Sequence, residues 1–490
     1  MEHLPVLLVL VPLLAAPVAA LVRRPRLSWL VALGASWWAW FAAVTLLDRV
    51  LAGGTISYAL GGWAAPWGIE YRIGLPNAFV LVIVASIAAV VTPYSLVSVE
   101  RELERGRIGL FYAVWVLCLA GLLGIAATGD AFNLYVFLEI SSLSTYALVA
   151  LGRDRRALTA AYQYLVIGSV GAAFVLIGIG LMYGLTGTLN IADLAERVRP
   201  LASTRTLQVA FAFVTVGLSL KLALFPLHLW LPNAYTLAPS AVSAFLAGTA
   251  TKVAVYMLLV FHFMVFGTGF AFDVMRLGAI LMPLAILGIL ATSGIAIYQG
   301  NVKRLLAYSS VAQIGYIVLG VSLASVGGLA AGLIHLFNHS LIKGALFMAM
   351  GAVMYRVGSV RLEAFTGLGR KMPWTMAAFV LGGLSLIGVP LTVGFVSKWL
   401  LVQAALAQGL WWVAVVVLVG SLLAVIYVWR VVEVAYLRPT PPDSEVREAP
   451  LALLVPLWVL VLANLYFGVD ATLTSEVATR AAEQLMGLAR

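Results

Sequence analysis

The sequence predicts an all-α polytopic membrane protein with about fourteen transmembrane helices, and three observations support this fold class. Apolar residues make up 63% of the 490-residue chain and charged residues only 10%, whereas an average soluble domain is about 25% charged. A hydrocarbon core about 30 Å thick needs about 20 consecutive apolar residues per helix, and fourteen stretches of the chain meet that requirement. Basic residues also gather behind alternate stretches, which is typical of a chain that crosses a bilayer many times.

In chain order, the predicted spans cover residues 5–22, 28–47, 77–97, 108–127, 130–151, 160–185, 207–231, 240–266, 275–297, 304–323, 328–355, 374–402, 409–437 and 450–470. Arginines follow the first span and none precedes it, so we expect a retained helix there rather than a signal peptide. Outside the spans, residues 189–206 and 471–490 predict two short surface helices. The segment Pro439-Thr440-Pro441-Pro442 predicts a turn or linker.

The distribution of basic residues predicts the orientation of the chain. Seventeen arginines and lysines follow odd-numbered spans, and eight lie on the opposite side. The positive-inside rule therefore places both termini on the outer face, in a bacterial inner (plasma) membrane. The net charge of +10 belongs mostly to these loops, so we expect contact with the lipid bilayer and no binding of nucleic acid.

Spans seven and twelve share an irregularity that indicates broken helices. Both contain Gly-Leu-Ser-Leu, at 217–220 and 383–386, followed by Pro226 and Pro390 respectively. Proline removes a backbone donor and frees a carbonyl one turn back, and paired interrupted helices indicate inverted repeats around a transport path. A chance match of four residues is the alternative. The predicted domains are helices 1–3 (1–107), a first repeat of helices 4–8 (108–266), a second inverted repeat of helices 9–13 (267–437), and a linker, helix 14 and tail (438–490).

One acid and four lysines are expected deep within the spans: Glu139, Lys221, Lys252, Lys343 and Lys398. A charge at the bilayer centre costs about 2.5–3.5 kcal/mol on insertion scales, so each must face the protein interior or water. We expect Glu139 to pair with Lys221, because it is the one acid deep in a span; a static structural ion pair is the alternative. Four lysines along one path would suit proton transfer.

Span eleven carries His335, His339 and Lys343 at i, i+4 and i+8, on one helical face. They cover about 12 Å at 1.5 Å per residue. Histidine exchanges protons near neutral pH and a buried lysine can lose its proton, so the row resembles a proton relay. A metal site is disfavoured because no acid on that helix completes a ligand set. Structural histidines with satisfied hydrogen bonds remain the other alternative.

Three further polar residues are expected to support the row: His228, Ser309 and Gln313. The chain shows no dinucleotide-binding glycine motif and no phosphate-binding loop. Its single cysteine, Cys118, allows no disulfide framework, cysteine-based metal site or iron–sulfur cluster. We therefore expect no cofactor, no metal and no redox centre within this chain.

Four segments carry a family resemblance: FNLYVFLE (132–139), KLALFPLHLWLP (221–232), LAYSS (306–310) and HLFNHSLIK (335–343). They resemble the antiporter-like subunits shared by respiratory complex I and Mrp-type cation/proton antiporters, over nearly the whole chain. FNLYVFLE and YGLTGTLN (183–190) are most similar to the D-type subunit of Mrp antiporters. The resemblance implies fourteen helices, two inverted five-helix repeats and broken helices 7 and 12. It also implies functional roles for Glu139, Lys221, Lys252, Lys343 and Lys398.

The expected function is that of a proton-translocating subunit in a multisubunit monovalent cation (sodium)/proton antiporter, with a buried Glu-Lys-His-Lys relay. Sodium prefers several oxygen ligands, as other hard cations do, and the spans offer one deep carboxylate, so we expect this subunit to carry protons. One alternative is a proton-pumping subunit of a complex I-like NADH-quinone oxidoreductase or membrane-bound hydrogenase. The other is a non-conducting membrane scaffold. All three imply other membrane subunits as partners.

Overall fold

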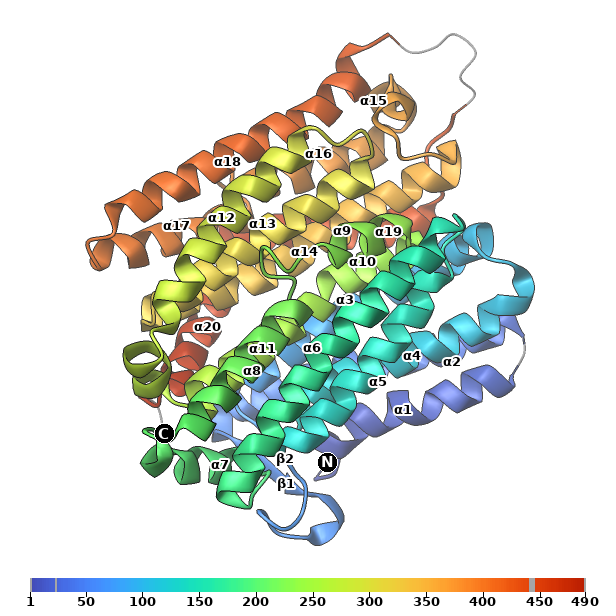
Figure 1. The fold of residues 1–490 in the computed structure, drawn as a ribbon. Helices are drawn as coiled ribbons and strands as arrows, with labels where there is room; N and C mark the ends of the chain where they lie inside the picture. Colours follow the sequence, from blue (N-terminus) through green and yellow to red (C-terminus); the bar gives the residue numbers. More distant parts are fainter. Residues whose placement is uncertain (1, 23, 440–445, 489–490) are drawn as a thin grey trace.

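A computed structural model describes residues 2–22, 24–439 and 446–488, which form one helical bundle (Figure 1). Within these residues, twelve spans are long and apolar enough to cross a membrane. Eleven of them are α1 (Leu4–Leu21), α2 (Pro25–Gly53), α3 (Leu75–Glu102), α4 (Arg105–Ala127), α5 (Ala131–Ala150), α6 (Arg156–Thr186), α12 (Leu277–Ile297), α13 (Val302–Ser322), α14 (Val326–Val357), α18 (Trp411–Val432) and α19 (Leu451–Val469). The predicted linker lies largely outside the described residues.

Two further spans are broken helices, as predicted. Span seven consists of α8 (Arg205–Lys221) and α9 (Trp230–Leu237), and span twelve consists of α16 (Pro373–Ile387) and α17 (Val393–Ala407). Each first half ends at the fourth residue after the glycine of the shared Gly-Leu-Ser-Leu motif. Pro226 and Pro390 lie in the connecting segments, which also contain non-glycine residues with positive φ, Ala223 (59°) and Leu391 (71°). With these two spans the fold has the expected fourteen crossings.

Predicted span eight is the remaining long span, and it contains a break that the sequence did not predict. It is divided into α10 (Ser240–Gly248), α11 (Ala250–Leu259) and a π-helical end, η3 (Val260–Val265). The discontinuity is at Thr249, whose φ and ψ of −128° and −60° are not helical. No proline lies near Thr249, and glycine at 248 is tolerated inside membrane helices, so the sequence carries no clear signal for this break.

Both chain ends lie at one end of the bundle, which we call the terminal face (Figure 1). A small antiparallel hairpin also lies there, formed by β1 (Ile56–Ala59) and β2 (Glu70–Ile73). The sequence predicted only a loop over 48–76, because two four-residue strands do not stand out from a connecting segment. The two predicted surface helices are present as α7 (Ile191–Val198) and α20 (Thr472–Leu485).

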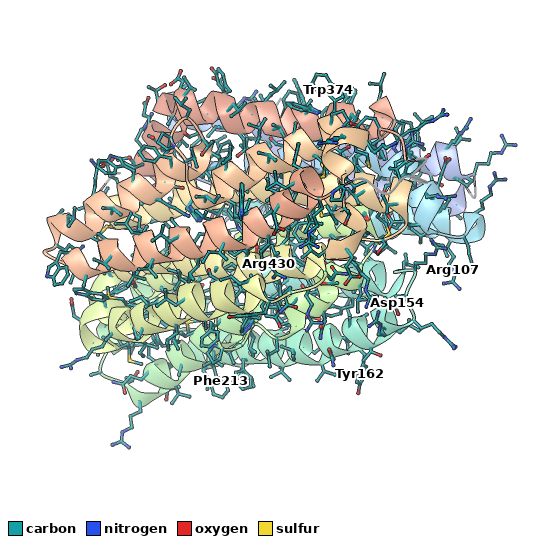
Figure 2. The ribbon with its side chains drawn as sticks, turned by 90° about the horizontal axis from the view of Figure 1, so that it is seen from above. Arg107, Asp154, Tyr162, Phe213, Trp374 and Arg430 are labelled. Atoms are coloured by element: carbon teal, nitrogen blue, oxygen red, sulfur yellow. The ribbon has the colours of Figure 1, made fainter. Side chains whose placement is uncertain are left out.

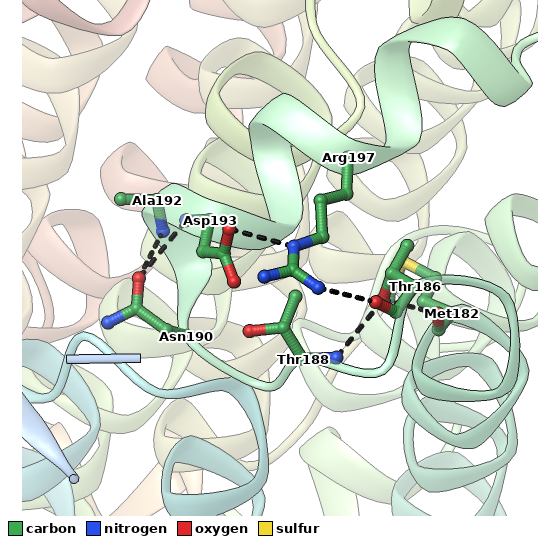
Figure 3. A network of polar contacts seen from close by, with 7 residues as sticks. All are labelled: Met182, Thr186, Thr188, Asn190, Ala192, Asp193 and Arg197. Atoms are coloured by element: carbon green, nitrogen blue, oxygen red, sulfur yellow. Dashed lines mark hydrogen bonds and ion pairs between the residues drawn. The ribbon is translucent and has the colours of Figure 1, made fainter. Parts of the chain in front are cut away.

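Helix α7 is held at the terminal face by a polar network (Figure 3). The Asn190 side chain accepts hydrogen bonds from the backbone N–H groups of Ala192 and Asp193, at 3.0 and 3.1 Å, and so caps the helix. Arg197 pairs with Asp193 at 2.8 Å and donates to the Thr186 carbonyl at the end of α6. These bonds fix a short helix that would not be stable alone.

The remaining short elements are η1 (Leu60–Gly62), η2 (Arg199–Leu201), η4 (Gly269–Val274), η5 (Leu362–Phe365), α15 (Leu368–Lys371) and η6 (Glu433–Leu437). The centre of the bundle is formed by α13, α14 and the α10–α11 span, whose side chains are mostly buried. Helices α1, α12, α18 and α19 keep apolar side chains on the outside, as expected for surfaces in contact with lipid. The candidate functional residues are concentrated in the buried centre.

Candidate functional site

Lys221 is the last residue of α8, where span seven breaks. Its Nζ donates to Ser142 Oγ at 2.9 Å and to Tyr146 OH at 3.4 Å, both on α5. The predicted direct pair with Glu139 is therefore not formed. The break places Lys221 opposite Ser142, about one helical turn beyond Glu139 on α5, and Glu139 acts on Lys221 electrostatically without contact.

Glu139 lies near the middle of α5, as expected. Its side chain is half-buried rather than enclosed. One carboxylate oxygen, Oε1, is buried and has no hydrogen-bond partner among the described residues. An unpaired buried carboxylate oxygen is costly, so this oxygen indicates a place for water or for a group from outside the chain.

Lys252 lies at the unpredicted break in span eight. Its Nζ donates to the backbone carbonyl of Ala247, which the break leaves without a helical partner, and to Thr251 Oγ1 at 3.4 Å. Lys252 is 1% exposed. It acts electrostatically on three groups of α14, His335, His339 and Lys343, so it lies beside the predicted histidine–lysine row.

The three α14 residues are all buried and line one helical face, as their spacing predicts. His335 Nδ1 contacts Ser397 Oγ at 2.8 Å and its Nε2 contacts Gln313 Oε1 at 3.0 Å. The His339 ring is parallel to that of His335, with centroids 6.3 Å apart, and neither of its nitrogens has a partner among the described residues. Lys343 donates to Ser309 Oγ and to the Leu306 carbonyl on α13.

Lys398 lies on α17, just after the break in span twelve. Its Nζ donates to the carbonyls of Leu386 and Ile387 at the end of α16, at 3.1 and 2.9 Å, and to Ser421 Oγ on α18 at 3.0 Å. It also lies over the ring of Tyr316, 4.8 Å from the centroid. The carbonyls freed by the broken helix thus bind an ammonium group directly.

His228 lies in the non-helical segment between α8 and α9, so it does not share a helical face with Lys221. Its ring stacks on Phe225 and meets the edge of Tyr308 on α13, with centroids 5.2 and 6.3 Å apart. Both ring nitrogens are buried and have no partner in the described part of the chain. Buried polar groups usually have a hydrogen-bond partner, so both ring nitrogens of His228 are available to exchange protons.

Helix α13 carries partners for three members of the row. Ser309, Gln313 and Tyr316 contact Lys343, His335 and Lys398 in turn. The sequence predicted that Ser309 and Gln313 support the row, but it did not identify which of its members they contact. It missed the hydroxyl partners Ser142, Tyr146, Ser397 and Ser421 and the ring of Tyr316. Serine and tyrosine are common in membrane helices, and nothing in one sequence distinguishes those that meet a lysine or histidine of the row.

The buried lysines are held without acids. Within the described residues, the ion pairs closer than 4.0 Å all involve arginines outside the row: Arg107–Glu104, Arg156–Asp154, Arg197–Asp193, Arg438–Glu433 and Arg480–Glu476. No group of three or more His, Cys, Asp or Glu side chains that could hold a metal ion occurs among those residues. The row consists of ammonium and imidazole groups bound by hydroxyls, an amide and backbone carbonyls, and such groups accept and release protons.

Comparison with known proteins identifies the family. The pattern of the family described as NADH:quinone oxidoreductase/Mrp antiporter, TM matches residues 128–424. A NADH-quinone oxidoreductase subunit N of Desulforudis audaxviator (strain MP104C) is 42% identical over 482 residues, 95% of each chain. A Na(+)/H(+) antiporter subunit of the D type from Bacillus subtilis (strain 168) is 31% identical over 447 residues, 90% of this chain and 88% of the relative.

The fold agrees with the sequence comparison. A chain in the structure of the Mrp complex from Dietzia sp. DQ12-45-1b is 29% identical and superposes with a TM-score of 0.90, covering 99% of this chain and 97% of its own length. The family match covers more than half of the 490 residues. The protein is therefore a multi-pass membrane protein that belongs to the NADH:quinone oxidoreductase/Mrp antiporter transmembrane family.

Proposed function

We propose that this chain carries protons across the membrane as one subunit of a larger membrane assembly. The observation that carries the proposal is the buried row of Lys221, Lys252, Lys343 and Lys398, with His335 and His339 between them. Each lysine has neutral partners rather than a carboxylate. A permanent ion pair would hold a lysine charged, whereas hydroxyl and carbonyl partners leave its proton exchangeable.

The proposed order of proton transfer begins at Glu139 and Lys221. The carboxylate stabilises the charged lysine through space. When Glu139 is protonated or drawn toward another group, Lys221 loses that stabilisation and releases its proton inward. Because Lys221 and Glu139 do not touch, this electrostatic control requires no ion pair to be broken.

The proton then passes across the bundle. His228 lies in the break after Lys221, and Lys252 lies beside the α14 face. His339 has two unpaired ring nitrogens, so it can take a proton on one and release it from the other. His335, bound to Gln313 and Ser397, connects this face to α17, where Lys398 receives the proton.

Two inverted repeats, residues 108–266 and 267–437, would frame this path, preceded by helices 1–3 (1–107) and followed by the linker, helix 14 and tail (438–490). The equivalent ends of α8 and α16, each four residues after the same motif glycine, support this division. The basic loops support an orientation with both termini on the outer face of a bacterial inner membrane. Labelling of single cysteines introduced at 476 and 370 from each side of the membrane tests that orientation.

We propose a sodium/proton antiporter as the assembly, with the sodium path in another subunit, because the described residues hold no group of three or more His, Cys, Asp or Glu side chains that could bind a metal ion. Glu139→Gln abolishing sodium flux by the subunit alone would contradict that assignment. The 42% identical relative favours a second candidate, a proton-pumping subunit of a redox-linked complex such as NADH-quinone oxidoreductase. Co-purification of small antiporter subunits or of redox subunits with the native chain distinguishes the two.

Proton flux in reconstituted vesicles tests the proposal itself. Lys343→Ala is expected to abolish flux, whereas Lys371→Ala, a lysine outside the row, leaves it unchanged. If Lys343→Ala conducts like the wild type but its assembly with partner subunits fails, the chain is a scaffold instead. Native gels of the same membranes report the assembly.

A further inference from the structure

A cavity of about 750 Å³ opens at the end of the bundle opposite the terminal face. Arg107 and Asp154 are labelled toward this end of the bundle in Figure 2. The cavity is lined by the end of α3, the start of α6, the start of α13 and the segment after α14. Its charged lining residues are six cations, Arg101, Arg153, Arg156, Lys303, Arg304 and Arg361, and two acids, Glu102 and Asp154.

The two acids are already engaged. Asp154 accepts from Arg156 at 2.6 Å, and hydrogen bonds from Arg156 hold the pKa of Asp154 below its ordinary value. Glu102 accepts from the backbone N–H of Ser240 at 3.0 Å, where it caps α10, and from Ser98 Oγ at 2.9 Å. Glu102 also acts electrostatically on Lys303. Two acids therefore face six cations, and an excess of positive charge remains in the cavity.

Apart from Arg156, the cations of the cavity form no ion pair within 4.0 Å in the described part of the chain. Lys303 is 2% exposed, yet its one hydrogen bond among the described residues goes to the Ala238 carbonyl at 2.8 Å, although an ammonium group has three donors. The Nε of Arg304 is buried and has no partner in the same part of the chain. Arg101, Arg153 and Arg361 form no ion pair there within 4.0 Å.

The sequence places Lys303 in a loop on this side of the membrane, but the structure buries it. A buried cation with unused donors is costly unless a counter-charge is present. The start of α13 lies at the same cavity, with Asn301 in its lining, and the amino-terminal end of a helix adds partial positive charge. This field repels sodium and hydronium, so the cavity does not suit the mouth of a cation path.

We propose that this cavity binds a phosphate group, carried by the headgroup of an anionic phospholipid or by a free phosphate anion. Phosphate oxygens accept several charge-assisted hydrogen bonds at once, which matches the unused donors of Lys303, Arg304 and Arg361. Basic pockets at this level of a membrane protein are suited to lipid headgroups. The bound group also joins the end of α3 to α13, across the two halves of the bundle.

Calorimetric titration of the full chain in a neutral detergent tests the site. The probes are dihexanoylphosphatidylglycerol, zwitterionic dihexanoylphosphatidylcholine and inorganic phosphate. We expect the anionic lipid to bind at least about tenfold more tightly than the zwitterionic lipid. Lys303→Gln and Arg361→Gln are each expected to weaken binding about fivefold, corresponding to about 1 kcal/mol per basic residue near an anionic lipid. Arg105→Gln, an exposed charge on the same face, serves as the matched control.

The three probes distinguish the sources of the phosphate. Binding of inorganic phosphate alone assigns a free anion, and binding of the anionic lipid alone assigns a headgroup. Lys303→Arg keeps the charge and should bind like the wild type, which separates loss of charge from loss of folding. The proposal is overturned if neither anion binds, or if Lys303→Gln and Arg105→Gln lose the same amount of binding affinity. Cross-linking of Lys303 to an acidic segment of a partner subunit in the native assembly also overturns it.

Discussion

Ser309→Ala is expected to slow proton transfer strongly, while the neighbouring Ser310→Ala is not. Both serines are buried on α13, and both hydroxyls donate to the Leu306 carbonyl, at 2.9 and 3.0 Å. Only Ser309 also accepts a hydrogen bond from Lys343. The two substitutions therefore remove the same group from adjacent positions and differ in one contact.

The magnitude follows from the charge on Lys343. A hydrogen bond to a charged group contributes about 1.5–3 kcal/mol, and about 1.4 kcal/mol corresponds to a factor of ten. Without the Ser309 hydroxyl, the charged form of Lys343 keeps only the Leu306 carbonyl at 2.9 Å. The proton-bearing state should fall in population by about 10- to 150-fold, and flux should fall with it at neutral pH.

A pH-sensitive dye in reconstituted vesicles measures this flux. Ser309→Ala should lose at least about tenfold in rate, and part of the loss should be recovered at lower external pH, because a higher proton concentration repopulates charged Lys343. Ser310→Ala should remain within about twofold of the wild type, since it loses only a neutral hydrogen bond whose acceptor keeps other donors. Equal effects of the two substitutions, or a Ser309→Ala loss that does not change with pH, would refute the role given to this contact.

Three other outcomes are expected. Ser142→Ala removes the closest hydrogen-bond partner of Lys221 and should reduce proton flux about tenfold. Ser144→Ala should leave the flux unchanged, because the Ser144 hydroxyl donates only to the Ile140 carbonyl of its own helix. Similar rates for the two variants would argue against the role of Ser142. Tyr316→Leu should reduce flux several-fold by removing a cation–π contact worth about 0.5–2 kcal/mol, and Tyr316→Phe should restore it; a Phe variant as slow as Leu would assign the effect to the hydroxyl instead. Asn190→Ala should cost α7 about 1 kcal/mol, seen as roughly fivefold faster amide exchange in that helix, and unchanged exchange would mean that its other contacts suffice.

The fold was largely predictable because lipid imposes simple rules. Twenty apolar residues per crossing, a proline in a span and alternation of basic loops are local signals, and they located the spans and the breaks near Pro226 and Pro390. The break at Thr249 carries no such signal, since it depends on how α10 and α11 pack within the bundle. The hairpin at 56–73 was missed for a related reason, because its strands are stabilised by pairing with each other.

The site was predictable in its residue types and less so in its contacts. Burial of Lys221, Lys252, Lys343 and Lys398 followed from their place in apolar spans. The pairing of Glu139 with Lys221 did not follow, because opposite charge indicates attraction but gives no helix register. Once α8 ends at residue 221, the nearest acceptors are hydroxyls of α5. Lys303 was overlooked because a residue next to the predicted end of a span is easily read as loop.

The helix breaks have an electrical consequence. Lys221 and Lys398 lie at interruptions near the middle of their spans, so both are far from either membrane surface. A proton that moves between them travels mostly parallel to the bilayer and does little work against the membrane potential. The full cost of about 2.3 kcal/mol per charge per 100 mV is then borne by the steps that load the first lysine and empty the last. Voltage should therefore alter the rates of uptake and release and leave the exchange among Lys252, His339 and Lys343 almost unaffected.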